Sequence, residues 1–218
     1  MTSCQTIRDV LDAKSDSTVY IVDDDPDLRI AVSLLVRSVH LHAIMFSSAS
    51  EFLDSYNPQQ PGCLVLDVRL PGMTGLELQQ QLKARGIRLP VIMVTGHGEI
   101  SLATQAMRAG ALDFLQKPYS PHTLLERIFE ALKLDKELRD KSSAKSSVEA
   151  RISVLTERER EVMMHLVNGE STKRIARELG ISSKTVDNHR VKILEKLGVQ
   201  NTVQLANFIT GGTEESSP

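Results

Sequence analysis

The sequence predicts an α/β domain built on a five-stranded parallel sheet, followed by a small all-α domain. Short apolar or β-branched runs alternate with segments of helical periodicity as far as residue 133, and only helical patterns remain beyond residue 151. Such alternation is typical of βαβ units, which place helices on both faces of one parallel sheet. The 218 residues also suit two modest domains better than one small module.

Each strand of the first domain is expected at an apolar run and each helix at a start signal. The expected strands are 19–22, 42–46, 63–68, 91–95 and 111–116, and the expected helices are 26–39, 49–56, 75–85, 101–109 and one that begins at residue 121. Pro26 suits a first helical position, and Ser48 with Glu51 forms a capping-box pattern. The third run is apolar on both faces until Asp67, as a central buried strand should be.

Four short helices are expected in the second domain, at 157–167, 172–179, 183–197 and 202–209. Thr156 with Glu159 is a capping box, Ser182 or Ser183 caps the third helix, and Gly180 permits a tight turn. Between the domains, charge and serine replace the apolar pattern, which indicates a helix that frays into a linker. We therefore expect an extension over 1–17, a first domain over 18–133, a helical, serine-rich linker over 134–150, a second domain over 151–211 and a polar tail over 212–218.

Charge is divided unevenly along the chain. Residues 1–130 carry 11 basic and 15 acidic side chains, whereas residues 171–197 carry 7 basic and 3 acidic ones. This asymmetry favours an acidic, cation-binding first half and a short basic surface that could meet a polyanion. No apolar run approaches the roughly 20 residues of a membrane span, and no apolar signal region follows the N-terminus. We therefore expect a cytoplasmic protein with no membrane contact, in which Cys4 and Cys63 are reduced thiols.

Chemically active side chains are concentrated where the expected strands end. Asp23, Asp24 and Asp25 follow the first strand, Asp67 ends the third, Thr95 ends the fourth and Lys117 follows the fifth. In the flavodoxin-like strand order 2-1-3-4-5, the first and third strands are neighbours, so these carboxylates converge. Gathered carboxylates need a cation, and hard oxygen ligands suit Mg²⁺. A nearby ammonium and hydroxyl make a site for a transferred phosphoryl group.

These residues resemble the receiver domain of the bacterial two-component response regulators. The matching features, in chain order, are Asp23 and Asp24, Asp67 in LVLDVRLPGMTGLEL, Thr95 in VIMVTGHGE, and Lys117-Pro118 in DFLQKPY. The resemblance implies that Asp67 accepts a phosphoryl group from a phosphohistidine of a sensor histidine kinase. It also implies that Asp24, Asp67 and the backbone carbonyl of Arg69 bind Mg²⁺, with Asp23 acting largely through water.

The same resemblance assigns the remaining residues of the site. Lys117 would pair with phosphoryl oxygens, Thr95 would hydrogen-bond one of them, and Phe114 occupies the position of the family's switch aromatic. The Lys117–Pro118 bond is expected to be cis. Simpler interpretations stay open: Phe114 as a core residue, Asp25 as a helix N-cap, which is the favoured role, and His97 as a solvated loop residue.

The sequence Leu179-Gly180-Ile181 has the form of the tight connection in a helix-turn-helix. In the helix that follows, the expected buried stripe consists of Val186, Val191, Ile193, Leu194 and Leu197, and the expected outer face of Lys184, Thr185, Asn188, His189, Lys192 and Lys196. A helix that is apolar inside and polar outside suits a DNA major groove.

This region resembles the LuxR-type output domain of the regulators grouped with NarL and FixJ. The matching residues are Leu155-Thr156 with Glu159, Ile175-Ala176, Leu179-Gly180-Ile181, Thr185-Val186, and His189 followed by Leu194, Lys196 and Leu197. The resemblance implies that the helix from Ser183 to Leu197 binds promoter DNA at paired half-sites. The candidate DNA contacts are Lys173, Lys184, Thr185, Asn188, His189 and Lys192. The helix over 202–209 could belong to the core or to a dimer surface.

Both resemblances together predict a transcriptional regulator rather than an enzyme, with only Mg²⁺-dependent self-phosphorylation and slow autodephosphorylation. Phosphorylation of Asp67 would favour a homodimer or release a masked recognition helix. Two other functions remain open. A phosphatase would use Asp67 as its nucleophile, but such enzymes generally place an acid/base carboxylate where Arg69 stands. An adaptor would bind protein or RNA with its helical domain.

Overall fold

The computed structural model describes residues 17–96 and 100–210, which form two compact units. The first unit ends at Arg139 and the second begins at Asp140. Within the described ranges, no helix is both long enough and apolar enough to span a membrane. Cys63 is a buried free thiol, and Cys4 and His97 lie outside the described residues.

The first unit contains five parallel strands in the order β2-β1-β3-β4-β5, which confirms the predicted topology. Their bounds are β1 Thr18–Val22, β2 His42–Phe46, β3 Gly62–Asp67, β4 Val91–Thr95 and β5 Asp113–Gln116. The register pairs Val22 with Leu66 and Asp67 with Val94. The carboxyl ends of β1, β3 and β4 therefore meet at one edge of the sheet, where the predicted chemistry is concentrated.

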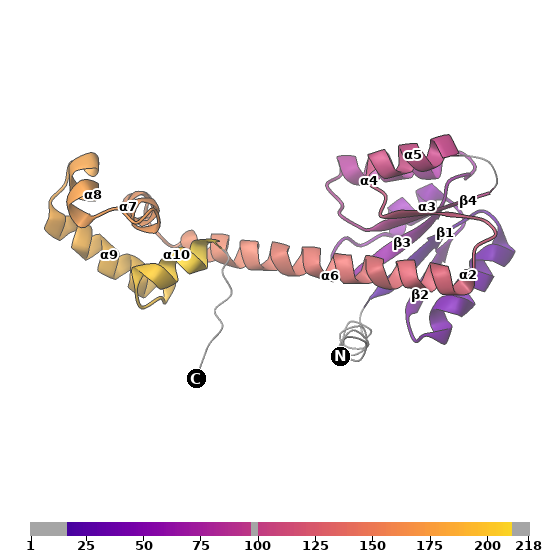
Figure 1. The fold of residues 1–218 in the computed structure, drawn as a ribbon, viewed down its shortest axis with the longest axis horizontal. Coiled ribbons are helices and arrows are strands. Elements are labelled where there is room, and N and C mark those ends of the chain that lie inside the picture. The colour runs from indigo at the N-terminus through magenta and orange to yellow at the C-terminus, as the bar shows by residue number, and fades with distance from the viewer. Residues whose placement is uncertain (1–16, 97–99, 211–218) are drawn as a thin grey trace. The chain divides into compact units, whose positions relative to one another are not determined.

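Helices cover both faces of this sheet (Figure 1). Their bounds are α2 Pro26–Ser38, α3 Ala49–Ser55, α4 Gly75–Ala84, α5 Ile100–Ala109 and α6 Pro121–Ile152. Alternate residues of a strand face opposite sides: Leu64 and Leu66 pack with α3, α4 and α5, whereas Cys63 and Val65 pack with α2 and α6. The fully buried β3 bears out the expectation of a central strand.

Helix α6 runs through the linker, which was expected to be helical, but it does not fray within the serine-rich segment as predicted and continues to Ile152. Its buried Asp135 accepts a hydrogen bond from the backbone N–H of Gly62 at 2.9 Å and another from Arg139 Nε at 2.7 Å. Arg139 also donates to the carbonyl oxygens of Gln59 and Gln60. These bonds fasten α6 to the start of β3, so the first unit reaches Arg139 rather than residue 133.

The second unit is a helical domain with its own apolar core. Its helices are α7 Glu157–Val167, α8 Thr172–Leu179, α9 Ser183–Leu197 and α10 Thr202–Thr210. Val162, Ile175, Val186 and Ile193 are fully buried in that core. The capping box of Thr156 and Glu159 is present as predicted, and the cap of α9 is Ser182.

The turn between α8 and α9 is made at Gly180, which adopts a left-handed conformation with φ of 65°. Glycine tolerates this conformation because it lacks a β-carbon. The N–H of Ile181 donates to the carbonyl oxygen of Ala176, which closes the turn against α8. The geometry is that of a helix-turn-helix, as the sequence predicts.

Candidate functional site

Three predicted residues meet at the carboxyl edge of the sheet. Asp67 ends β3, Asp23 directly follows β1, and Lys117 follows β5. Lys117 Nζ lies 2.7 Å from Asp67 Oδ1 and 2.7 Å from Asp23 Oδ2. Both aspartates are buried, at 6% and 8% exposure, so one ammonium neutralises two carboxylates that are largely removed from water.

At Asp67 and at Lys117, burial and hydrogen bonding shift the pKa in opposite directions. Burial raises the pKa of Asp67, and the hydrogen bond from Lys117 offsets only part of that rise. Burial lowers the pKa of Lys117, but its hydrogen bonds to Asp23 and Asp67 outweigh burial and leave it raised. Lys117 therefore stays charged, and Asp67 is a buried carboxylate held close to a fixed cation.

The neighbouring aspartates differ in their surroundings. Asp25 caps α2, because its Oδ1 accepts hydrogen bonds from the N–H groups of Asp27 at 2.9 Å and Leu28 at 3.3 Å. The favoured N-cap role is thus confirmed. Asp24 is exposed, and its carboxylate has neither a hydrogen bond nor an ion pair among the described residues. The structure brings together Asp23 and Asp67, while Asp24 stands at the rim.

The backbone positions the second oxygen of Asp67. Its Oδ2 accepts a hydrogen bond from the N–H of Arg69 at 2.6 Å, and the Arg69 side chain is exposed. Asp23 Oδ1 similarly accepts from the N–H of Asp25 at 2.9 Å. Each of the two buried carboxylates is therefore held by one backbone N–H and by the shared Lys117.

Thr95 and Phe114 lie on the strands that complete this edge. Thr95 ends β4, is 1% exposed, and its carbonyl oxygen accepts from the N–H of Lys117 at 2.7 Å. The ring of Phe114, on β5, is half-buried and packs against the core that α3, α4 and α5 cover. The Lys117–Pro118 peptide bond is cis, as expected.

Sequence reasoning missed a contribution of Gly75, the first residue of α4. An added β-carbon at Gly75 would lie 2.3 Å from the carbonyl oxygen of Asp67, and the N–H of Gly75 donates to the carbonyl oxygen of Val68 at 3.0 Å. Only glycine allows α4 to approach the strand end this closely. The signal in the sequence was the glycine at the start of the helix expected over 75–85.

The candidate DNA-binding residues occupy the outer side of the helix-turn-helix. Lys184, Asn188 and Lys192 are exposed on α9, and their spacing of four residues places them on one face. Lys173 is exposed on α8. Thr185 is half-buried, and both its N–H and its hydroxyl bond the hydroxyl of Ser182, so it takes part in the cap of α9.

Three predictions about α9 need correction. Val191 is 64% exposed rather than part of the buried stripe, because it lies on the same face as Asn188, three residues earlier. Lys196, expected on the outer face, donates to Glu159 Oε2 at 2.7 Å and so links α9 to α7. His189 is half-buried, and its Nδ1 is buried with no hydrogen-bond partner in the described part of the chain, so the ring is only partly on the outer face.

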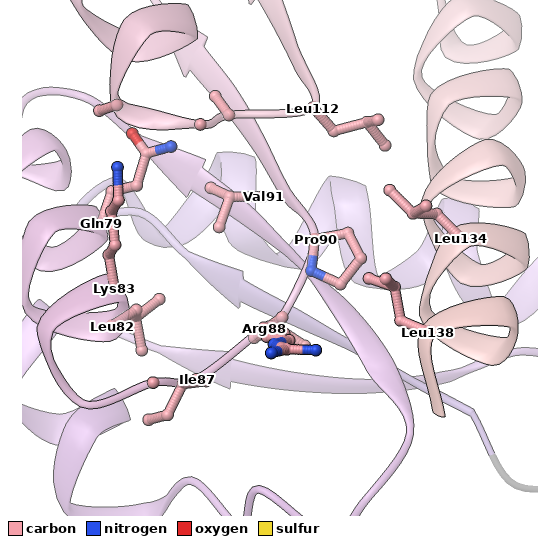
Figure 2. A pocket seen from close by; sticks show the side chains of 15 residues that line it. Gln79, Leu82, Lys83, Ile87, Arg88, Pro90, Val91, Leu112, Leu134 and Leu138 are labelled. Atoms are coloured by element: carbon pink, nitrogen blue, oxygen red, sulfur yellow. The ribbon is translucent and has the colours of Figure 1, made fainter. Parts of the chain in front are cut away.

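A hollow of about 560 Å³ lies at a different part of the first unit, between the ends of α4 and α5 and the helix α6 (Figure 2). Its walls are mainly apolar, with Leu82, Ile87, Leu134 and Leu138 among them. Leu134 and Leu138 reach it only because α6 continues beyond residue 133. None of the predicted site residues lines it, so it is separate from the carboxylate edge.

Comparison with known families matches both units. The family model described as "Response regulator receiver domain" matches residues 19–129. The family model described as "Bacterial regulatory proteins, luxR family" matches residues 153–209. The first match lies within the first unit and the second match within the second unit.

Several relatives match nearly the whole chain. The transcriptional regulatory protein TdiR of Thauera aromatica is 41% identical over 201 residues, which cover 92% of this chain and 88% of TdiR. The transcriptional regulatory protein FixJ of Azorhizobium caulinodans is 40% identical over 190 residues, covering 87% and 90% of the two chains. The solved structure of the response regulator StyR superposes with a TM-score of 0.80 at 40% identity, covering 90% of this chain and 100% of StyR.

Proposed function

This chain belongs to the two-component response regulators that join a receiver domain to a LuxR-type DNA-binding domain, and from that premise we propose that Asp67 is its phosphorylation site. The observation that carries the proposal is the position of Lys117, whose ammonium lies 2.7 Å from Asp67 Oδ1. An ammonium at that distance can pair with the oxygens of a phosphoryl group on Asp67.

The phosphoryl donor is a phosphohistidine of a sensor histidine kinase. A carboxylate oxygen of Asp67 forms the new bond to phosphorus while the bond between phosphorus and the imidazole nitrogen breaks, and the nitrogen keeps that electron pair. Self-phosphorylation from a small phosphodonor and slow hydrolysis of the acyl phosphate follow from the same site. The position two residues after Asp67 holds the exposed Arg69, so no carboxylate stands there to support phosphatase turnover.

The donor set of this edge fits Mg²⁺. Asp24, Asp67 and the carbonyl oxygen of Arg69 would hold the ion, with Asp23 reaching it through water; all of these are the hard oxygen donors that Mg²⁺ prefers. When bound, Mg²⁺ would neutralise the charge on the transferred phosphoryl oxygens. The exposure of Asp24 beside two buried carboxylates suits an ion that keeps several of its waters.

The kinase is proposed to dock where an apolar groove of about 490 Å³ borders the site. Lys117 and Gly96 line this groove together with apolar residues of α2 and with Pro118 and Tyr119. On the same helix, Ile30 and Leu34 are 50% and 63% exposed. A helix of the kinase laid in this groove would bring its phosphohistidine to the carboxylate edge.

DNA binding is proposed for the exposed face of α9. Lys184 and Lys192 would contact phosphates, which gives affinity without sequence preference, and Asn188 could read adenine. Phosphorylation is proposed to favour a homodimer that binds two half-sites, with Thr95 and Phe114 as the residues that respond to the phosphoryl group.

Selection from a random-sequence duplex library tests this proposal. Wild type, Asp67→Asn and the control Asp54→Asn, an exposed aspartate on α3, are compared at one salt concentration, with and without Mg²⁺ and a small phosphodonor. We expect a paired half-site motif only with phosphorylated wild type and phosphorylated Asp54→Asn. If Asp67→Asn gains DNA affinity from the phosphodonor, Asp67 is not the switch.

A further inference from the structure

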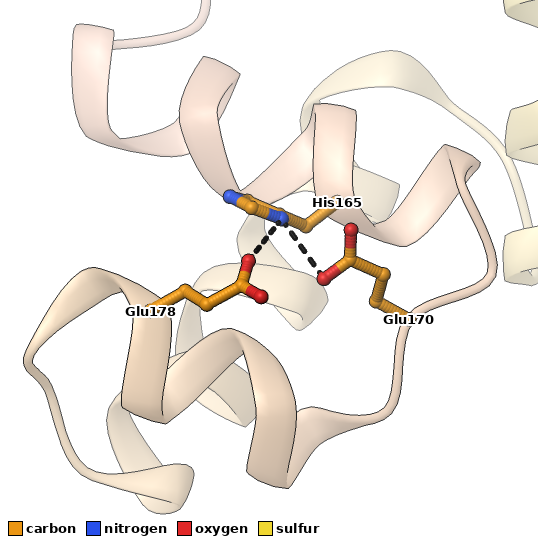
Figure 3. Close-up of side chains that lie close together, drawn as sticks. All are labelled: His165, Glu170 and Glu178. Atoms are coloured by element: carbon orange, nitrogen blue, oxygen red, sulfur yellow. Dashed lines mark ion pairs between the residues drawn. The ribbon is translucent and has the colours of Figure 1, made fainter.

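Three side chains of the second unit meet at one point outside the proposed DNA-binding face (Figure 3). His165 lies near the end of α7, Glu170 in the connection to α8, and Glu178 near the end of α8. His165 Nδ1 is 3.1 Å from Glu170 Oε2 and 3.4 Å from Glu178 Oε2. One ligand atom of each residue lies within 4.8 Å of the others, an arrangement that no other three His, Cys, Asp or Glu side chains of the described ranges share.

These contacts are short, yet they lack hydrogen-bond geometry. His165 Nδ1 and Glu170 Oε2 are both buried atoms without a hydrogen-bond partner among residues 17–96 and 100–210. Figure 3 shows the imidazole nitrogen pointing toward the two carboxylates, so Nδ1 faces the space between them. Buried polar atoms normally find a partner in protein, water or an ion. An ion placed between the nitrogen and the two oxygens would satisfy all three residues at once.

The two distances from His165 Nδ1 are close to those of a tetrahedral transition-metal site, and the two carboxylate oxygens lie within 4.8 Å of each other. Zinc binds imidazole nitrogen and carboxylate oxygen at about 2.0–2.2 Å, and a tetrahedron of that size separates its ligand atoms by about 3.3–3.6 Å. Of the two separations from His165 Nδ1, 3.4 Å lies within this range and 3.1 Å is slightly shorter. Mg²⁺ and Ca²⁺ prefer oxygen ligands only, so the imidazole selects against them.

Arg174 pairs with both carboxylates of this cluster. Its Nε lies 3.0 Å from Glu178 Oε1 and 3.3 Å from Glu170 Oε2, so it holds both carboxylates in place. Outer partners of this kind commonly orient the ligands of metal sites. Glu178 Oε2, which faces His165, is not the oxygen that Arg174 bonds, whereas Glu170 Oε2 lies between His165 and Arg174.

We propose that His165, Glu170 and Glu178 bind a divalent transition-metal ion of the zinc class, which fastens α7 to α8. Helix α8 is the first helix of the helix-turn-helix, and its connection to α7 carries Glu170. A bound ion therefore restrains the segment that leads into the DNA-binding motif and stabilises this domain.

Full-length protein stripped with a chelator is titrated with Zn²⁺ in excess Mg²⁺ and followed by differential scanning calorimetry. Zn²⁺ at a hundredfold excess over its Kd should raise the Tm of the helical domain by about 5 °C or more. His165→Gln and Glu170→Gln should lose this shift. His122→Gln should keep it, because His122 pairs with Glu126 at 3.3 Å on an exposed helix face, outside the cluster.

A second readout uses Co²⁺, whose visible absorption reports tetrahedral nitrogen and oxygen ligation. The absorption should appear in wild type and in His122→Gln and be absent from His165→Gln. The receiver carboxylates are the same in all of these proteins, so a difference between them must come from the cluster. Absence of any Zn²⁺-dependent shift in wild type, or an equal shift in His165→Gln, overturns the proposal.

Discussion

Gly75 packs so closely against Asp67 that a β-carbon at position 75 would lie 2.3 Å from the carbonyl oxygen of Asp67. Helix α4 thus begins directly against the last residue of β3. The backbone of Asp67 is held from this side, while its carboxylate is held by Lys117 and by the N–H of Arg69. The position of the proposed nucleophile depends on a residue that contributes no side chain.

Gly75→Ala should therefore impair phosphorylation of Asp67. The added carbon must displace α4 or the end of β3, and a displacement of about 1 Å at a reacting group can cost about a hundredfold in rate. We expect at least a tenfold lower rate of phosphorylation by a small phosphodonor, measured by intact-protein mass. Overpacking should also lower the free energy of unfolding by about 1–3 kcal/mol.

Gly62→Ala is the matched control for that loss of stability. Its β-carbon would lie 2.1 Å from the carbonyl oxygen of Thr18, at the opposite end of β3 from Asp67. This variant should be destabilised to a similar degree, yet its folded molecules should be phosphorylated at the wild-type rate. Equal losses of rate in the two variants would show that Gly75 acts only through general stability.

Replacement of Lys117 by Met should make stability depend on pH in a defined direction. Without the ammonium, the buried carboxylates of Asp67 and Asp23 face each other, and the pKa of Asp67, already raised by burial, should rise further. A carboxyl whose pKa is higher in the folded state stabilises the fold at low pH and loses that stabilisation as pH rises. Urea unfolding should show a loss of about 2–3 kcal/mol at pH 7 that shrinks at pH 5.

Lys133→Met serves as the control, because Lys133 is an exposed lysine of α6 in the same domain. Its unfolding free energy should match wild type at both pH values. A Lys117→Met protein whose deficit is the same at pH 5 and pH 7 would contradict the proposed coupling between Lys117 and the two carboxylates.

The sequence was sufficient for the sheet order and for the meeting of Asp23, Asp67 and Lys117, because parallel strands share one carboxyl edge. The sequence was insufficient to predict the full length of α6, because the composition of 134–150 suggested a fraying linker. The bonds from Asp135 and Arg139 to Gly62 and its neighbours, which hold this helix, link segments far apart in the chain. Helical spacing also put Val191 in the buried stripe and Lys196 on the outer face, and both assignments were wrong. Spacing alone does not reveal which lysine finds a buried partner such as Glu159.

The ion pair between Glu159 and Lys196 predicts an acid-sensitive helical domain. The hydrogen bond from Lys196, aided by the N–H of Thr156, lowers the pKa of Glu159 to about 2. A carboxyl whose pKa is lowered by folding stabilises the fold above its unfolded pKa and loses that contribution as pH falls. The domain should therefore lose stability between about pH 4.5 and pH 2.

Glu159→Gln should lower the free energy of unfolding at pH 7 by about 1.5–3 kcal/mol, the usual contribution of a hydrogen bond to a charged group. It should also flatten the decline in stability below pH 4.5, which can be followed by circular dichroism during urea unfolding. Glu195→Gln removes an exposed carboxylate of α9 and should change neither quantity. An unaltered acid profile in Glu159→Gln would assign the sensitivity to other groups.

Two valines of α9 allow DNA contact to be separated from folding. Val186 is fully buried, whereas Val191 is 64% exposed on the face that carries Asn188. Val186→Ala should cost about 1–3 kcal/mol of stability because it leaves a cavity, whereas Val191→Ala should cost less than about 0.5 kcal/mol. For DNA affinity we expect the opposite ranking: Val191→Ala should weaken binding more than Val186→Ala does. The reason is that an exposed valine can contact a thymine methyl group in the major groove.

Fluorescence anisotropy with the selected half-site duplex, at fixed salt, measures that reversal. Val191→Ala should weaken binding to the selected sequence by about fivefold or more and leave binding to an unrelated duplex unchanged, because a base contact carries sequence preference. Lys192→Ala should instead weaken both and reduce the salt slope by about 1, because a phosphate contact acts through counterion release. If Val191→Ala binds the selected sequence like wild type, the exposed face of α9 does not enter the groove through this residue.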